Sequence, residues 1–195
     1  MIILKSIIAF ASTNIDDLFV LMLFFANRQM RARNVVIGQF VGMVALILIS
    51  IVASFVGLVV EQKYIGLLGL FPIYFGIKGL MGMLRKQPPD LRAKYEKTKF
   101  SGHGIVSVAS VTIANGADNL GVYIPLFSVL LVPQKLIMTT TFLAMTALWC
   151  ILAWYLSKYG MIGKMISKFG HIISPIVLLL LGLYILFISR TFELI

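Results

Sequence analysis

Two short polar motifs place oxygen-bearing side chains inside apolar stretches of the chain. The first motif reads Thr13-x-x-Asp16-Asp17, and the second reads Asn115-x-x-Asp118-Asn119. Positions i, i+3 and i+4 share one face of an α-helix, so each motif presents its oxygens on one side of its helix. Carboxylate, amide and hydroxyl oxygens are the hard donors that divalent cations prefer.

Brought together, the two faces could supply six oxygen ligands, and Asn14 lies beside the first set. We therefore predict a metal site formed by Thr13, Asn14, Asp16, Asp17, Asn115, Asp118 and Asn119. The alternative is hydrogen bonding between helices with no substrate. An aspartate at the centre of a membrane helix costs about 2.5–3.5 kcal/mol, whereas amides would join helices at lower cost. This difference favours the metal site.

Other residues near the motifs leave alternatives open. Gly116, Gly121 and Pro125 would permit a break in the second helix, although close packing or a simple kink explains them equally well. Participation of Met43, Met145 and Lys78 in the site also stays open. The aromatic residues, including Trp149 and Trp154, follow no pattern that indicates a function.

The elements that carry the motifs are predicted to be transmembrane helices. Hydrophobic residues make up 60% of the 195-residue chain and charged residues only 12%, about half the charged fraction of a typical soluble domain. Six apolar stretches are long enough to cross a bilayer, which takes about 20 helical residues. They are Ile2–Ala26, Val35–Val60, Tyr64–Leu84, Ile105–Val132, Leu136–Leu156 and Ile172–Ser189. The fold class predicted is an all-α integral membrane protein.

The chain also repeats itself. A shift of 102 residues superposes Asp16-Asp17-Leu18 on Asp118-Asn119-Leu120, and a shift of 103 superposes Pro72 on Pro175. Each unit holds three helices, an odd number, so the two units must cross the membrane in opposite directions. The sequence therefore predicts two inverted three-helix repeats, residues 1–84 and 104–195, joined by a basic linker over 85–103. Inverted repeats are an architecture of transporters.

The basic residues predict the orientation of these helices. Twelve lysines and arginines lie in the first, third and fifth connections, against four on the opposite side. The side with twelve should be cytoplasmic, which leaves both termini external. The net charge of +10 is spread over these short connections, so no arm that would bind nucleic acid is expected. The single cysteine, Cys150, excludes an internal disulfide, and we expect no cleaved signal peptide.

Four stretches of the chain resemble one known family, in the same order. They are STNIDDLFVLMLFF (12–25), IGQFVGMVALILIS (37–50), GLLGLFPIYFGIKGL (66–80) and ANGADNLGVYIPLF (114–127). On these segments the chain resembles the bacterial cadmium-resistance transporters, within the LysE-type exporter superfamily. The resemblance implies a six-helix exporter of divalent metal, cadmium above all, in a bacterial cytoplasmic membrane. It assigns Asp16, Asp17, Asn115, Asp118 and Asn119 to the polar motifs of the family.

We therefore expect an exporter rather than an enzyme, with no cofactor. Its partners would be the metal cation, protons and the lipid bilayer, and a homodimer is left open. Proton exchange is the expected driving force, because the chain has no GxxxxGK[ST] nucleotide motif. An exporter of amino acids or small organic cations from the same superfamily is the alternative. A membrane enzyme or scaffold is a further alternative, which no Ser/His pairing or HExxH motif supports.

The charge asymmetry predicts that the loop containing Lys94 is cytoplasmic. A Lys94→Cys variant in intact cells should therefore react slowly with a membrane-impermeant thiol reagent, and quickly once the cells are opened. Rapid labelling in intact cells would show that the orientation is the reverse.

Overall fold

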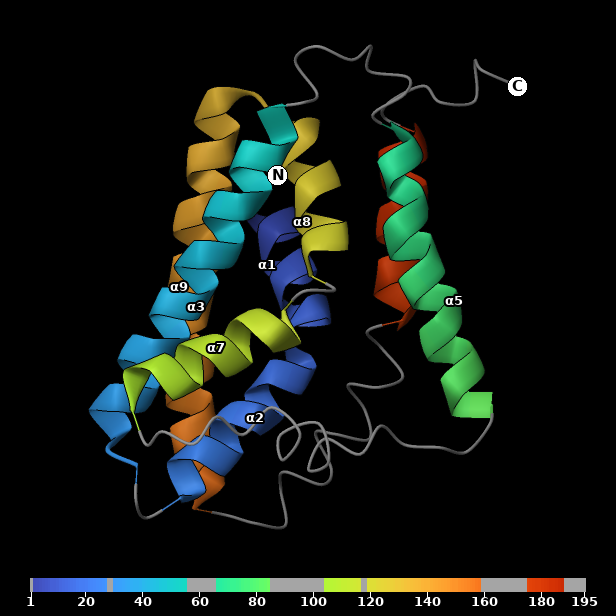
Figure 1. The fold of residues 1–195 in the computed structure, drawn as a ribbon. Helices are drawn as coiled ribbons and strands as arrows, with labels where there is room; N and C mark the ends of the chain where they lie inside the picture. Colours follow the sequence, from blue (N-terminus) through green and yellow to red (C-terminus); the bar gives the residue numbers. More distant parts are fainter. Residues whose placement is uncertain are drawn as a thin grey trace.

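The computed structural model describes residues 2–27, 30–55, 66–84, 104–116, 119–158 and 175–187. Every regular element within these ranges is helical (Figure 1). The elements are α1 (Ile2–Thr13), α2 (Ile15–Ala26), α3 (Ala32–Ser54), the 3₁₀ turn η2 (Gly66–Gly69), α5 (Leu70–Leu84), α7 (Ile105–Asn115), α8 (Leu120–Ser128), α9 (Val132–Ser157) and an unlabelled helix, Pro175–Phe187. The all-α prediction is thereby confirmed for the described residues. The linker predicted over 85–103 lies outside them.

The first predicted span, Ile2–Ala26, is not one continuous helix. It bends by 61° between α1 and α2, at Asn14. The prediction of a single helix was wrong because hydropathy reports only how apolar a segment is. The Asn14 backbone has φ −110° and ψ 16°, outside the helical region, and its side chain bonds the Phe10 carbonyl oxygen at 2.8 Å. A side chain that bonds local backbone in this way competes with continued helix formation.

The fourth predicted span, Ile105–Val132, likewise appears as two helices, α7 and α8. In Figure 1 α7 lies close to horizontal, whereas α8 lies close to vertical. The glycine that follows α7, Gly116, is buried: a Cβ there would lie 2.3 Å from Leu46 Cδ1. Gly121 of α8 lies against α5, where a Cβ would be 2.7 Å from Phe75 Cε2. Both the break and the close packing that the sequence left open are therefore present.

Two described helices, α3 and α9, are long and apolar enough to cross a membrane, and the bent pair α1–α2 would make a third span. The other three of the six predicted spans remain a prediction. The third and sixth predicted spans, Tyr64–Leu84 and Ile172–Ser189, contain the shorter apolar helices α5 and Pro175–Phe187. The end of the predicted span Val35–Val60 falls on residues outside the described ranges, since α3 is described to Ser54.

The interior of the helix bundle holds polar residues beside its apolar core, and apolar residues cover its surface. On α3, Gln39 and Ser50 are buried, while Leu48 and Val52 are exposed. In a water-soluble helix the buried stripe is the apolar one. Exposed apolar side chains also line the other helices, among them Leu70 and Ile77 of α5, Leu136, Ile151 and Trp154 of α9, and Leu180 and Phe187. Such a surface is suited to lipid.

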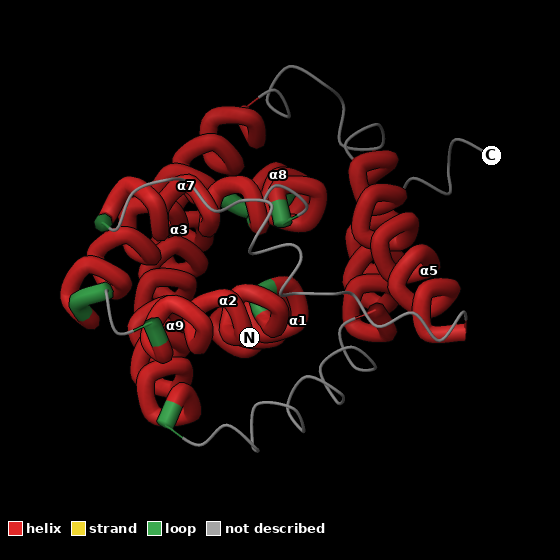
Figure 2. Tube along the Cα trace, turned by 60° about the horizontal axis from the view of Figure 1, so that its bottom comes forward, coloured by secondary structure: helices red, strands yellow, loops and turns green. Residues whose placement is uncertain are grey.

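The helix Pro175–Phe187 packs beside α5, to one side of the other helices (Figure 1, where it is red). Figure 2 again shows α5 apart from the group formed by α1, α2, α3 and α9. A Cβ on Gly182 would lie 2.5 Å from the carbonyl oxygen of Gly69, and one on Gly76 would lie 2.7 Å from that of Pro175. Rising residue numbers on one helix face falling numbers on the other, so the two helices are antiparallel.

Glycines also bring α3 against α7. A Cβ on Gly38 would lie 2.5 Å from Val108 Cβ, and one on Gly42 would lie 2.6 Å from Thr112 Cβ. Two small residues four positions apart let helix backbones approach closely in membranes. This contact matters for the site because Gln39 of α3 and Thr112 of α7 lie on the facing surfaces.

The α3–α7 contact predicts that Gly42→Ala destabilises the protein, by about 1–3 kcal/mol as for other overpacked cores. Gly82 is the matched control, since a Cβ there would meet no atom within 4 Å. Thermal unfolding of the detergent-solubilised protein should show a lower midpoint for Gly42→Ala and an unchanged or slightly higher one for Gly82→Ala. Equal midpoints would mean that α3 and α7 do not need this close approach.

Candidate functional site

Asn14, at the break between α1 and α2, is completely buried, and both its side-chain amide and its backbone carbonyl are hydrogen-bonded. Besides Phe10, its side-chain amide donates to Thr13 Oγ1 at 2.9 Å and to the Tyr123 hydroxyl at 2.6 Å. Its backbone carbonyl accepts a bond from the Trp149 indole N–H at 2.8 Å. The bend is therefore held from α8 and α9 as well as by local bonds.

The carboxylate of Asp17, one turn into α2, is 3% exposed and accepts bonds from two other helices. The Gln39 side-chain amide of α3 donates to Asp17 Oδ2, and the Asn115 amide of α7 donates to Oδ1 at 3.1 Å. Thr112 in turn donates its hydroxyl to Gln39 Oε1 at 2.6 Å, which fixes the direction of that amide. Neutral donors thus stabilise a buried charge.

A further bond joins the two halves of the chain, because Asn119 Nδ2 donates to Asn14 Oδ1 at 3.2 Å. The Thr13 and Tyr123 hydroxyls also lie 3.2 Å apart. We refer to the connected side chains as the polar cluster: Thr13, Asn14, Asp17, Gln39, Thr112, Asn115, Asn119 and Tyr123. All eight are buried, so the cluster is closed to the surface.

The side-chain oxygen of Asn115 has no donor among the residues that the structure describes. Asn115 Oδ1 is buried and accepts no hydrogen bond from them, although the same amide donates to Asp17. A buried carbonyl oxygen without a donor is uncommon and costs free energy, so it requires an explanation. Asn115 Oδ1 could hold a cation together with the Asp17 carboxylate only if the amide turned, because Nδ2 now faces that carboxylate.

The break also places the N-terminus of α2 beside the polar cluster. Asp16 and Asp17 occupy the first turn of α2, where the helix dipole favours negative charge. A continuous helix would not provide this stabilisation. Discontinuous helices of this kind surround ion and substrate sites in transporters.

The structure brings together five of the seven predicted site residues: Thr13, Asn14, Asp17, Asn115 and Asn119. Asp16 lies in the same turn as Asp17 and is half-buried. Asp118 lies outside the described residues. Within the described ranges, no group of three or more His, Cys, Asp or Glu side chains could hold a metal. The described part of the site is therefore rich in amides and hydroxyls.

Of the residues whose role was left open, Met43 and Met145 are buried in the core. Lys78 is exposed on α5, with its Nζ 5.9 Å from the centre of the Tyr74 ring. Among the aromatic residues, Trp149 does take part, through its bond to Asn14. The sequence shows no pattern of aromatic residues from which this contact could have been predicted.

Three members of the cluster were not predicted from the sequence. Gln39 is an amide within the apolar run of α3, which was the available signal. Thr112 precedes Asn115 by three residues and Tyr123 follows Asn119 by four, so each shares a helix face with a predicted residue.

A family model described as cadmium resistance transporter matches residues 10–195. No curated protein and no solved structure matches the chain.

The bonds of Asn14 predict that Asn14→Ala destabilises the fold strongly. The change leaves the Asn119 amide and the Tyr123 hydroxyl short of partners, at about 1–3 kcal/mol for each buried group. Tyr123→Phe should cost less, because Asn14 keeps its bonds to Phe10 and Thr13. Thermal unfolding in one detergent would rank the variants, and a wild-type midpoint for Asn14→Ala would contradict the role assigned to this residue.

Proposed function

The chain belongs to the cadmium resistance transporter family, and we propose that it exports divalent metal cations, cadmium first, with the polar cluster as its substrate site. One observation carries this proposal: the buried carboxylate of Asp17 lies beside the Asn115 amide, whose Oδ1 has no donor among the described residues. With that amide turned, a divalent cation would bind both oxygens. Asp16 and Asp118 would supply further carboxylate ligands, and the Thr13, Asn14 and Asn119 oxygens would complete the set.

Rotation of the Asn115 side-chain amide would convert the site to the form that binds a cation or a proton. At present Nδ2 donates to Asp17 Oδ1 at 3.1 Å, which satisfies an ionised carboxylate. Rotation by half a turn would place Oδ1 in the position of Nδ2. Two oxygen acceptors would then face each other, an arrangement that is stable only with a metal cation between them or a proton on the carboxyl group.

The same two oxygens would couple export to protons. With a proton on Asp17 Oδ1, the carboxyl group would donate to Asn115 Oδ1. An arriving cation would displace this proton and coordinate both oxygens. Burial favours the neutral carboxyl group, whereas a cation favours the ionised form, so cation and proton compete for one place. This competition would make the protein a cation/proton antiporter.

A small cargo suits the cluster better than an amino acid. Direct side-chain bonds cross it from α1 to α8 and from α2 to α3 and α7. An amino acid or organic cation, the alternative cargo in this superfamily, would have to displace several of these bonds at once. For a metal ion, the side chains would need only to turn oxygen atoms toward it in place of the N–H groups that now donate these bonds.

Correspondence between the two halves of the chain supports an inverted repeat around this site. α1 ends at Thr13 and α7 at Asn115, while α2 ends at Ala26 and α8 at Ser128. Both pairs of ends are separated by the repeat of 102 residues. The repeat pairs Asp17 with Asn119 and Thr13 with Asn115, and the bond from Asn115 to Asp17 has its near-equivalent in the bond from Asn119 to Asn14, the residue next to Thr13. We place the protein in a bacterial cytoplasmic membrane, with both termini outside.

Removing the charge of Asp17 tests the function. Asp17→Asn should fold, because the Gln39 amide can turn and donate to the Thr112 hydroxyl while accepting a bond from the new amide. Loss of one charge from a low-dielectric site should weaken cadmium binding at least about tenfold. Cadmium uptake into inverted vesicles, driven by a pH gradient, should fall accordingly, as it should for Asp16→Asn and Asp118→Asn. Asn119→Ala should lose less, since water can replace a neutral ligand.

The matched control is Asp90→Asn, which removes the same charge from the predicted linker and should leave uptake unchanged. Parallel assays with zinc, manganese and an amino acid define the cargo. If the Asp17→Asn protein took up cadmium at the wild-type rate, the polar cluster would have a structural role only.

A further inference from the structure

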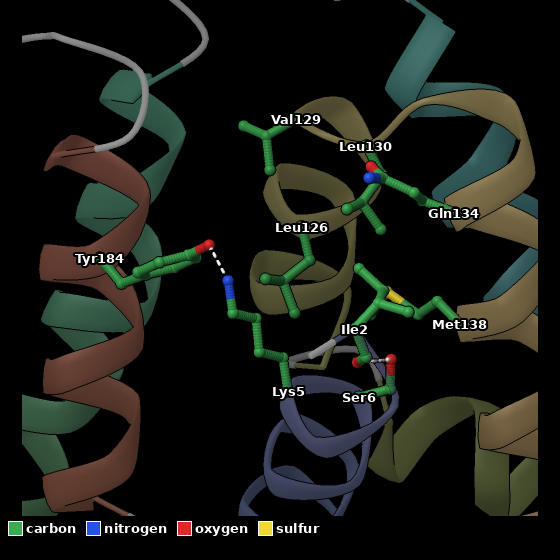
Figure 3. A pocket seen from close by; sticks show the side chains of 9 residues that line it. All are labelled: Ile2, Lys5, Ser6, Leu126, Val129, Leu130, Gln134, Met138 and Tyr184. Carbon is green, nitrogen blue, oxygen red and sulfur yellow. Dashed lines mark hydrogen bonds between the residues drawn. The ribbon is translucent and has the colours of Figure 1, made fainter.

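A cavity of about 170 Å³ lies at the N-terminal end of α1 (Figure 3). Its walls come from α1, α8, α9 and the helix Pro175–Phe187, and they include Ser6, Leu126, Met138 and Tyr184. The cavity is separate from the polar cluster, since none of its lining residues belongs to the cluster. Its volume holds several water molecules, each of which takes roughly 30 Å³ in the liquid.

The cavity continues the helix faces that form the polar cluster. On α1, Ser6 lines the cavity and Thr13 belongs to the cluster, seven residues or about 10 Å along the same face. On α8, Leu126 lines the cavity, and Tyr123 of the cluster precedes it by three residues. A route between the two regions would therefore follow one face of each helix.

Four aromatic side chains pack together along these helix faces. Phe142 lies four residues beyond Met138 on α9, and its ring centre is 5.5 Å from that of Phe10, 4.7 Å from Tyr123 and 6.2 Å from Phe127. All four residues of this aromatic block are completely buried. Phe142 contacts the other three rings, which come from α1 and α8, so it is the centre of the block.

The charge in the cavity suits release of a cation rather than storage. Lys5 donates a hydrogen bond to the Tyr184 hydroxyl, a neutral partner, as Figure 3 shows. Its ammonium charge would therefore repel a metal cation that had passed the aromatic block. A cation would bind tightly at Asp17 and weakly near Lys5.

We propose, on the basis of the export function above, that the cavity is the release vestibule for a hydrated divalent cation and that Phe142 is the gate residue between it and the polar cluster. In the structure described here the gate is closed. Displacement of the Phe142 ring would connect Thr13 and Tyr123 with Ser6.

Thiol labelling of the full-length protein tests the gate without any metal. In a Cys150→Ala background, Ile2→Cys and Thr13→Cys are exposed separately to a small impermeant thiol reagent in intact cells and in inverted vesicles; Ile2 lines the cavity and is only partly buried. Because a release vestibule must open outward, Ile2→Cys should react in intact cells, and Thr13→Cys should react there at least tenfold more slowly. Adding Phe142→Ala should raise the Thr13→Cys rate at least tenfold, and Phe142→Leu should raise it less while conserving the packing.

Phe24→Ala is the matched control, because it removes the same side chain from the buried core on α2, outside the aromatic block. It should leave the Thr13→Cys rate unchanged. An Ile2→Cys that is unreactive in intact cells, a fast Thr13→Cys with Phe142 intact, or an equal effect of Phe24→Ala would each overturn the gate. Failure of the wild-type protein to export any metal would overturn the proposed function and the cargo assigned to the vestibule but not the gate, since the labelling does not depend on cargo.

Discussion

The carboxylate of Asp17 is buried among mostly apolar helices, where an ionised group is costly unless other groups donate hydrogen bonds to it. Its donors, Gln39 and Asn115, come from α3 and α7, so those helices must lie close together. Gly38 and Gly42 allow that approach. The break at Asn14 contributes the N-terminus of α2, whose dipole favours the same charge. One buried carboxylate is thus stabilised by a helix N-terminus, a close helix contact and two oriented amides.

The polar motifs predicted much of the site, although not for the reason of a shared helix face. A break separates Thr13 from Asp17 and another separates Asn115 from Asn119, so these residues meet because both motifs lie at helix ends that pack together inside the bundle. The bend was not predictable from hydropathy, since neither Asn14 nor Ile15 is a helix breaker in the manner of proline. It depends on bonds to Tyr123 and Trp149, which are more than one hundred residues away in sequence.

The same reasoning explains why the aromatic residues looked unpatterned. The rings of Phe10, Tyr123, Phe127 and Phe142 lie on three different helices, so no single helix carries a periodic signal. Gln39 was visible as an amide in an apolar run, but its partner depended on the register of α3 against α7. A sequence pattern indicates which residues share a helix face, whereas the register of one helix against another is determined by how the two helices pack.

The interlocked glycines of α5 and the helix Pro175–Phe187 have a mechanical consequence. Gly69 and Gly182 bring backbone against backbone, and Gly79 accommodates the Pro175 ring, which would lie 2.6 Å from a Cβ there. Contacts between backbones have no rotamers through which to relax, so sliding one helix along the other meets steep steric resistance. The two helices should therefore move as one rigid unit. Lys5 of α1 donates a hydrogen bond to Tyr184 of this unit, so a tilt of the helix pair would also displace α1, the first helix of the site.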